Sequence, residues 1–238
     1  MLALLLLGVL AACDAGIETD TGSSPPAAGL GPHQLAVIVN DEDPLSRQIT
    51  DYYVNRRQIP ARNIIHVRFT PGDKVMRPAV FRELKAEVDR STPASVQAYV
   101  LTWTIPYRVG CMSITTAFAA GFDEDFCVLG CKPTRTSPYF DSGSTRPFDD
   151  HGWRPTMMLA GNSFESVRAL IERGVDADGT RPEGSAYLLS TTDRNRNTRA
   201  RFYPGIHLLQ SDRFNVQVIS SNTLRLRDDV MFYFTGLK

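Results

Sequence analysis

Short apolar runs alternate along the chain with segments in which apolar residues recur at helical spacing. The first run, Leu35 to Val39, is continuous, as in a strand that is buried on both faces of a parallel sheet. After it, Asp43 is placed to cap a helix and Pro44 suits the first helical position. Apolar residues then recur on one face of this helix as far as Arg57. The pattern therefore predicts a strand followed by a helix.

The same alternation continues to the end of the chain. Further strands are predicted at residues 63–69, 96–103, 156–160, 186–189, 215–219 and 230–234, further helices begin at Pro78 and Phe164, and a strand or short helix is predicted at 206–210. This order predicts an α/β fold with a doubly wound, mainly parallel sheet and helices on both faces. No helix is expected after the last apolar strand, which indicates that the domain is incomplete at its C-terminus.

A long polar insertion interrupts the pattern between two of the predicted strands. Residues 105–154 are rich in Gly, Pro, Ser, Thr and Asp, with one or two helical turns expected near residues 114–120. Loops of this length inside a compact domain are usually functional or partly disordered. We therefore expect one α/β domain over residues 34–238 that carries a long loop insertion.

The N-terminus has the pattern of an export signal. Residues 1–12 form an apolar run that is shorter than the roughly 20 residues needed to span a bilayer. The run ends in Leu10-Ala11-Ala12-Cys13, which resembles the bacterial lipobox, in which the cysteine receives a diacylglycerol. Residues 13–33 are rich in Gly, Ser, Pro and Ala and are expected to be a flexible tether. An ordinary signal peptide with an incidental cysteine is the alternative interpretation. No Lys or Arg precedes the apolar run, which indicates a misplaced start or missing upstream residues.

These features predict a protein of the bacterial cell envelope, facing the periplasm or the exterior, with the membrane as partner through a lipid anchor at Cys13. The chain has 26 basic and 26 acidic residues, so its net charge is zero. No overall field favours nucleic acid as a partner.

Cys111, Cys127 and Cys131 remain after Cys13 is set aside. Disulfides persist outside the cytoplasm, and three cysteines allow one bridge, which we expect to join Cys111 to Cys127 or to Cys131. The spacing of Cys127 and Cys131 would also suit half of a zinc site, but no second pair or nearby histidine completes four ligands. Neither a metal nor a cofactor is expected.

Ligands of open parallel sheets bind outside the carboxyl ends of the strands. The candidate catalytic residues at these ends are Asp41, Thr102, Arg108 and Asp193. They offer carboxylate, hydroxyl and guanidinium groups. The simpler interpretation of each residue is a helix cap or a strand end. The common Gly-x-Ser-x-Gly, Walker and His-Glu-x-x-His signatures do not occur.

Three other sets of polar residues have simple structural interpretations. His66 falls inside a predicted strand and is expected to be structural, and the triplet Asp149-Asp150-His151 is either an acid/base or metal cluster or a solvated turn. A basic stretch contains Arg194, Arg196, Arg199 and Arg201. It could bind phosphate or an acidic polysaccharide, or be a solvated loop.

Three stretches resemble an uncharacterised family of exported bacterial proteins: LAVIVNDEDPLSRQITDYYVNRRQIPARNIIHVRF, YVLTWTIPYRVGC and VMFYFTGLK. The resemblance covers most of the chain from Leu35 onward and implies export, without implying an activity. A weaker likeness is to the caspase and gingipain type of α/β peptidase, which places a His-Gly after one strand and a Cys after the next. Here His151-Gly152 precedes a predicted strand, which departs from that pattern.

The leading interpretation is a membrane-tethered envelope lipoprotein of unknown activity that serves as a binding or scaffold module, with a protein or small molecule as the unidentified partner. The alternative is a peptidase-like hydrolase with its site at the carboxyl ends of the strands, completed by a further C-terminal half. The two differ in whether the four candidate residues converge in one place.

Overall fold

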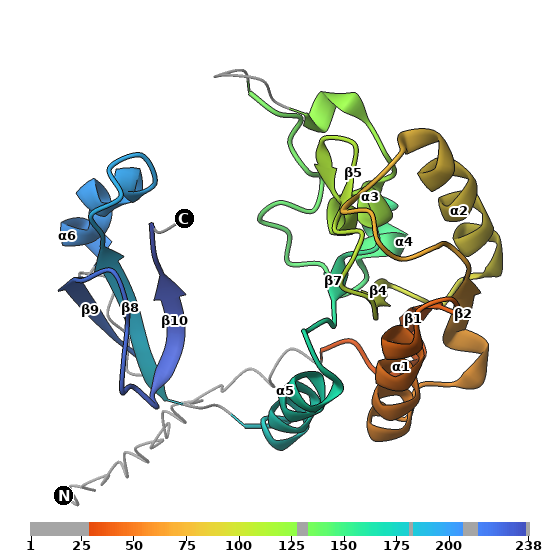
Figure 1. Cartoon of the computed structure of the whole chain (residues 1–238), viewed down its shortest axis with the longest axis horizontal. Coiled ribbons are helices and arrows are strands. Elements are labelled where there is room, and N and C mark those ends of the chain that lie inside the picture. The colour runs from red at the N-terminus through yellow and green to blue at the C-terminus, as the bar shows by residue number, and fades with distance from the viewer. Residues whose placement is uncertain (1–28, 128–132, 181–182, 207–213, 237–238) are drawn as a thin grey trace, which may run out of the picture. The chain divides into compact units, whose positions relative to one another are not determined.

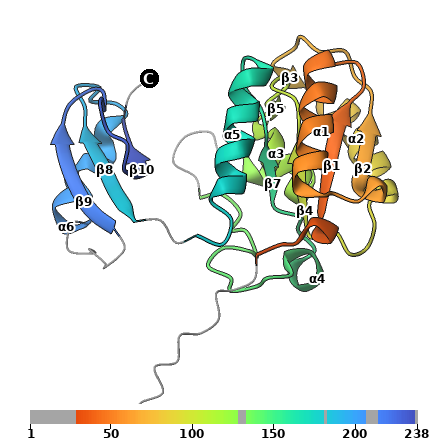
Figure 2. The ribbon, with the colours of Figure 1, turned by 90° about the horizontal axis from the view of Figure 1, so that it is seen from below.

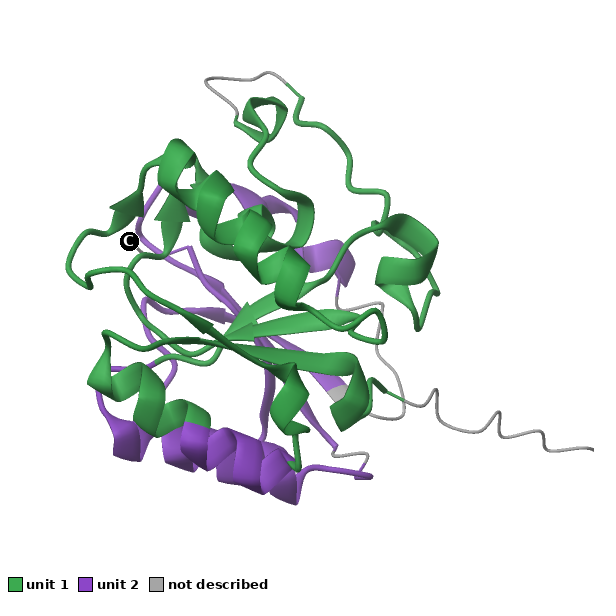
Figure 3. Cartoon of the chain, turned by 90° about the vertical axis from the view of Figure 1, so that its right-hand side faces the viewer, with its two compact units in different colours: residues 1–50, 58–160 green, residues 51–57, 161–238 purple. Residues whose placement is uncertain are grey.

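The computed structural model describes residues 29–127, 133–180, 183–206 and 214–236. The chain divides into two compact units (Figure 3). Unit 1 comprises residues 1–50 and 58–160, and unit 2 comprises residues 51–57 and 161–238. Cys13, the predicted lipidation residue, lies outside the described residues.

Unit 1 contains a parallel sheet and the helices that cover it (Figure 1). Its elements are β1 (Leu35–Asn40), α1 (Pro44–Arg57, which continues into unit 2), β2 (Ile64–Val67), β3 (Val75–Met76), α2 (Pro78–Ser91), β4 (Ala98–Leu101), β5 (Arg108–Val109), β6 (Met112–Ser113), α3 (Ile114–Ala120), α4 (Pro147–His151) and β7 (Thr156–Met158), with 3₁₀ helices η1 (Pro32–Gln34), η2 (Ala61–Asn63) and η3 (Glu124–Phe126). The main sheet has the order β2-β1-β4-β7. All its pairs are parallel, and Val37 of β1 lies opposite Ile64 on one side and Val100 on the other.

Helices cover both faces of this sheet (Figure 2). α1 lies on one face, and α2 and α3 lie on the other. The α2 and α3 side forms a core that includes Ile38 and Leu101 of the sheet. In this core Phe81 and Phe118 pack edge-to-face, with their ring centroids 5.2 Å apart. Because neighbouring residues of a strand point to opposite faces, the continuous apolar run of β1 serves both helical layers.

The predicted insertion contains regular structure. β5 and β6 form an antiparallel hairpin, and β5 also pairs in parallel with β3, so that a second small sheet has the order β3-β5-β6. Gly110 turns this hairpin with a φ of +52°, a left-handed conformation in which glycine is favoured. The hairpin residues Val109 and Met112 are buried in the core of unit 1. α3 follows at residues 114–120, where helical turns were predicted.

Unit 2 holds a second sheet. Its elements are α5 (Phe164–Asp176), β8 (Gly184–Ser190), η4 (Asn197–Phe202), α6 (Tyr203–Ile206), β9 (Phe214–Ser220) and β10 (Val230–Phe234), together with residues 51–57 of α1. The strands are parallel in the order β10-β8-β9. Ala186 and Leu188 of β8, Val216 of β9 and Tyr203 of α6 form a small core on one face.

The predicted fold class is confirmed: both larger sheets are parallel and helices flank them. Each predicted strand and helix from 35–39 to 230–234 is present, with its ends at most three residues from the predicted ones. The element predicted at 206–210 is the exception, because most of it lies outside the described residues. Within the described part of the chain, no helix is long and apolar enough to cross a membrane.

Glu172 of α5 joins this helix to the end of α1 within unit 2. Arg56 donates from Nε and Nη2 to the two carboxylate oxygens, at 2.8 and 2.7 Å, and the Tyr52 hydroxyl donates to the same carboxylate. The hydrogen bonds from Arg56 and then Tyr52 lower the pKa of Glu172 to about 2. Since the folded-state pKa is lowered, the stabilisation is complete above the ordinary pKa of 4.5 and is lost as the pH falls toward 2.

We expect Glu172→Gln to lower the unfolding temperature at neutral pH, because the neutral amide cannot replace the carboxylate between Arg56 and Tyr52. The difference from the wild type should shrink as the pH falls from 4.5 toward 2. Thermal unfolding followed by circular dichroism across this range measures it, with the exposed Glu87→Gln on α2 as control. A difference that is independent of pH would contradict this role of Glu172.

Candidate functional site

The order β2-β1-β4-β7 places a topological switch point between β1 and β4, because the chain moves outward from β1 on one side and then on the other. In open α/β sheets, ligands bind at the carboxyl ends of the strands at such a point. Asp41 follows β1 there, and Thr102 follows β4. The carboxyl edge of this sheet is therefore the candidate site.

Asn40, the last residue of β1, fixes the loop that carries Asp41. Its side chain is fully buried and its Nδ2 donates to the Phe69 carbonyl at 2.8 Å. Its Oδ1 accepts from the backbone N–H groups of Glu42 and Phe69, both at 3.2 Å. Asp43 then caps α1, as predicted, by accepting from the Leu45 N–H at 2.9 Å. The β1–α1 loop is thus held at both ends.

Asp41 itself is paired with one residue within β2 and one that follows β2. Its Oδ1 lies 2.7 Å from Nδ1 of His66, and its Oδ2 lies 3.6 Å from Nη2 of Arg68. The backbone carbonyl of Asp41 also accepts from Arg47 of α1. The Asp41 side chain is 22% exposed, whereas those of His66 and Arg68 are 62% and 77% exposed. We call Asp41, His66 and Arg68 the edge cluster.

The edge cluster presents both hydrogen-bond donors and acceptors to solvent. A carboxylate beside Nδ1 favours the tautomer with the proton on that nitrogen. In neutral imidazole Nε2 then carries the lone pair and points away from Asp41, since the two nitrogens lie on opposite sides of the ring. Arg68 adds a guanidinium that suits carboxylates and phosphates. This arrangement can bind a polar ligand and can exchange a proton with it.

Thr102 is not available to a ligand. It is fully buried, and its hydroxyl donates to the Ile38 carbonyl at 3.2 Å. The same oxygen lies 2.8 Å from the Ser46 hydroxyl and accepts from Thr50 at 2.9 Å. One donor and two acceptor positions complete the capacity of a hydroxyl. Thr102 therefore ties β4 to β1 and α1, which is the simpler of its two sequence interpretations.

The other two candidate residues have partners of their own. Arg108 lies in β5 and donates to the Gly110 carbonyl at 3.0 Å. Asp193 belongs to unit 2, where it pairs with Arg196 at 3.1 Å and accepts from the Arg196 N–H. Of the four candidates, Asp41 alone lies in the edge cluster. The structure does not bring the predicted set together in one unit.

The sequence interpretation missed His66. The residue lies within β2, as predicted, but its side chain is exposed, whereas a structural role inside the sheet implied burial. Ile65 and Val67 point into the core of unit 1, so alternation turns His66 to the opposite face. β2 is an edge strand of the main sheet, and the His66 side chain is 62% exposed there, beside Asp41. The polar residue between two apolar ones was the signal for this orientation.

The triplet Asp149-Asp150-His151 lies in the short helix α4, and each of its side chains has different hydrogen-bond partners. Asp149 accepts from Gln97 at 3.2 Å and pairs with Arg146, Asp150 accepts from Ser144 at 2.5 Å, and His151 bonds to Ser142 at 2.8 Å. Hydrogen bonds from Gln97 and then Arg146 lower the pKa of Asp149. Among the described residues, no group of three or more His, Cys, Asp or Glu side chains could hold a metal ion.

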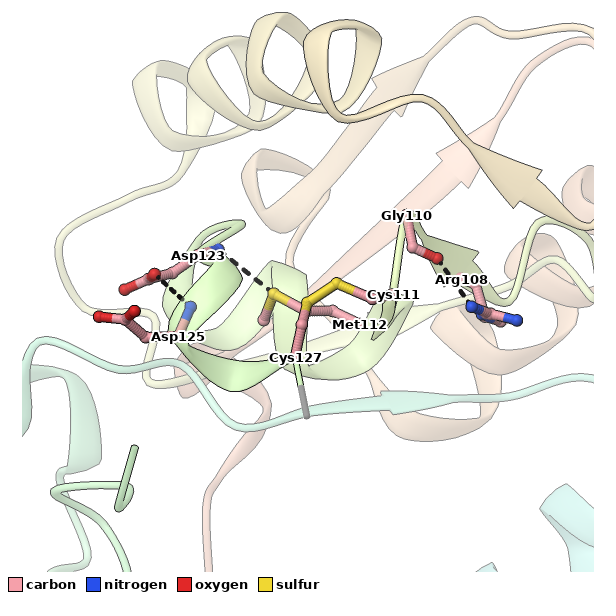
Figure 4. The surroundings of a disulfide bond; sticks show 7 residues. All are labelled: Arg108, Gly110, Cys111, Met112, Asp123, Asp125 and Cys127. Atoms are coloured by element: carbon pink, nitrogen blue, oxygen red, sulfur yellow. Dashed lines mark hydrogen bonds between the residues drawn. A yellow bond between two sulfur atoms is a disulfide. The ribbon is translucent and has the colours of Figure 1, made fainter. Parts of the chain in front are cut away.

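A disulfide joins Cys111 to Cys127, which confirms one of the two predicted pairings (Figure 4). The two Cα atoms are 5.6 Å apart and the bond closes a segment of 16 residues. It links the turn of the β5–β6 hairpin to the end of η3, and Cys127 packs against the core of unit 1. Cys131 lies outside the described residues.

No protein-family model, no curated protein and no solved structure matches the chain.

Replacing Thr102 by valine tests its assignment as a structural residue. The substitution removes the shared hydroxyl, so Ser46 and Thr50 lose a buried partner. We expect the free energy of unfolding to fall by about 1–3 kcal/mol in urea titrations. Thr102→Ser keeps the hydroxyl and should cost less. A valine variant as stable as the wild type would remove Thr102 from the network described here.

The double substitution Cys111→Ser with Cys127→Ser tests the disulfide. In the chain-entropy description, a closed loop of this length contributes about 3 kcal/mol. We expect a loss of that order in urea unfolding under oxidising conditions. Adding a reductant should destabilise the wild type and leave the double variant unchanged. Equal sensitivity of both proteins to reductant would show that the bond is not formed.

Proposed function

We propose that this chain is an exported bacterial envelope protein, anchored to a membrane by a lipid on Cys13, whose folded part is a binding module. The observation that carries the proposal is the Cys111–Cys127 disulfide. Disulfides of this kind persist in oxidising compartments and are rare in the cytosol. The export signal and lipobox of residues 1–13 and the resemblance to exported bacterial proteins support the same location.

The edge cluster supports binding as the role of the folded part. It lies where parallel sheets bind ligands, next to the switch point between β1 and β4. It offers the Asp41 carboxylate, Nε2 of His66 and the Arg68 guanidinium on an exposed surface. These groups suit a polar ligand that both donates and accepts hydrogen bonds and carries an acidic group for Arg68.

The anchor is tested by expressing the full chain in a bacterium fed with radiolabelled palmitate. We expect the wild-type chain to carry the label and to appear in the membrane fraction. Cys13→Ala should do neither, because only a cysteine at the lipobox accepts the diacylglycerol. Cys131→Ala is the matched control and should keep both. Equal labelling of wild type and Cys13→Ala, or no labelling of either, would refute the lipid anchor.

One observation favours a hydrolase as the second candidate function. The Asp41 carboxylate orients His66, which is how a histidine is prepared to act as a general base on water or a hydroxyl.

Hydrolysis of p-nitrophenyl acetate at neutral pH tests this second candidate. A hydrolase of this design would lose most of its rate in His66→Asn, which removes the Nε2 base, and much of it in Asp41→Asn. His151→Asn is the control, since that imidazole bonds to Ser142 instead of a carboxylate. If all four proteins have the same rate, the edge cluster is a binding site and not a hydrolytic one.

A further inference from the structure

The 3₁₀ helix η4 of unit 2, with the residues next to it, has one inward row and two exposed rows of side chains. A 3₁₀ helix has three residues per turn, so residues at i and i+3 share a face. Ala200 and Tyr203 form the inner row: Tyr203 is 2% exposed, and both pack in the core of the second sheet. Arg196, Arg199 and Phe202 follow the same spacing in one exposed row, and Arg201 lies in the other exposed row beside it.

The outer side combines positive charge with one exposed aromatic ring. Phe202 is 58% exposed, and the guanidinium carbon of Arg201 lies 4.7 Å from the centre of its ring. Asp193 is the only carboxylate in the sequence from 191 to 206, and Arg196 is paired with it. Arg199 and Arg201 are therefore left without an acidic residue in their own segment. We call Arg196, Arg199, Arg201 and Phe202 the arginine face.

Anionic phospholipid headgroups match this chemistry. Guanidinium groups bind phosphate oxygens with two parallel hydrogen bonds. A large apolar side chain beside basic residues is typical of segments that lie in the membrane interface. The net charge of the chain is zero, so any attraction to an anionic surface comes from a local cluster and not from the whole molecule.

We infer that the arginine face binds the phosphate groups of anionic phospholipids, with Phe202 entering the interface. The inference rests on the proposed lipid anchor only for its setting, since an anchored chain stays close to headgroups. A nucleic acid is the less suitable partner, because single-strand binding surfaces stack several bases on successive aromatic residues and η4 has one exposed aromatic residue.

Co-sedimentation with vesicles tests the inference. The full chain carrying Cys13→Ser is mixed with phosphatidylcholine vesicles with and without phosphatidylglycerol. The apolar leader would attach equally to both, so the difference between the two vesicle types is the readout. We expect tighter binding to phosphatidylglycerol, weakened by salt. Arg199→Gln with Arg201→Gln should reduce that difference by about fivefold for each arginine removed.

Matched variants distinguish binding through the arginine face from attraction by positive charge elsewhere or by any exposed apolar side chain. Arg62→Gln with Arg90→Gln removes the same charge from exposed positions in unit 1 and should leave binding unchanged. Phe202→Ser should weaken binding, whereas Phe140→Ser should not, although Phe140 is 78% exposed. Circular dichroism confirms that each variant is folded.

Three results would overturn the inference: equal binding to both vesicle types, equal loss in the two arginine pairs, or binding of heparin or single-stranded DNA through Arg199 and Arg201 without binding of phosphatidylglycerol. Because the chain in this experiment cannot be lipidated, its outcome is independent of the palmitate experiment. Failure of the anchor and failure of the arginine face are therefore distinguishable.

Discussion

The hydrogen bonding of Asn40 is the constraint on which the candidate site depends. The residue is fully buried at the end of the central strand β1, where unpaired polar groups would be costly. Its amide fixes the backbone after β1 and after β2, and its own N–H donates to Ser46, which in turn contacts Thr102. Three strand ends and the start of α1 are thereby held together. Asp41, one residue further along, has no freedom to leave this edge.

The polar groups at this edge divide into two sets according to burial. Asn40, Ser46 and Thr102 are buried, are bonded to one another and hold the sheet together. Asp41 and His66 lie just outside, where the bond between them uses one carboxylate oxygen and Nδ1 and leaves the His66 side chain 62% exposed. A rigid buried layer under a partly exposed polar layer is the arrangement that positions binding groups in a ligand site.

The sequence predicted the fold well because apolar spacing is a local property. The continuous run of β1, the Asp43 cap and the apolar stripe of α2 each depend on neighbours in sequence. The candidate site was predicted in part: Asp41 was found from its place after a strand. Its partner His66 was not, because their contact depends on parallel pairing across 25 residues. Thr102 was correctly predicted at the carboxyl edge of the sheet. Its burial was not predicted, because it depends on how Ser46 and Thr50 of α1 pack against it.

The central proposal is that the mature protein is lipid-anchored in an oxidising compartment. Mass spectrometry of the intact protein, extracted from bacterial membranes without reductant, tests it most directly. The account predicts a chain that begins at Cys13 with a diacylglycerol on its sulfur, and peptides in which Cys111 is linked to Cys127. A chain that retains residues 1–12, or one in which Cys111 and Cys127 are free thiols, would contradict it.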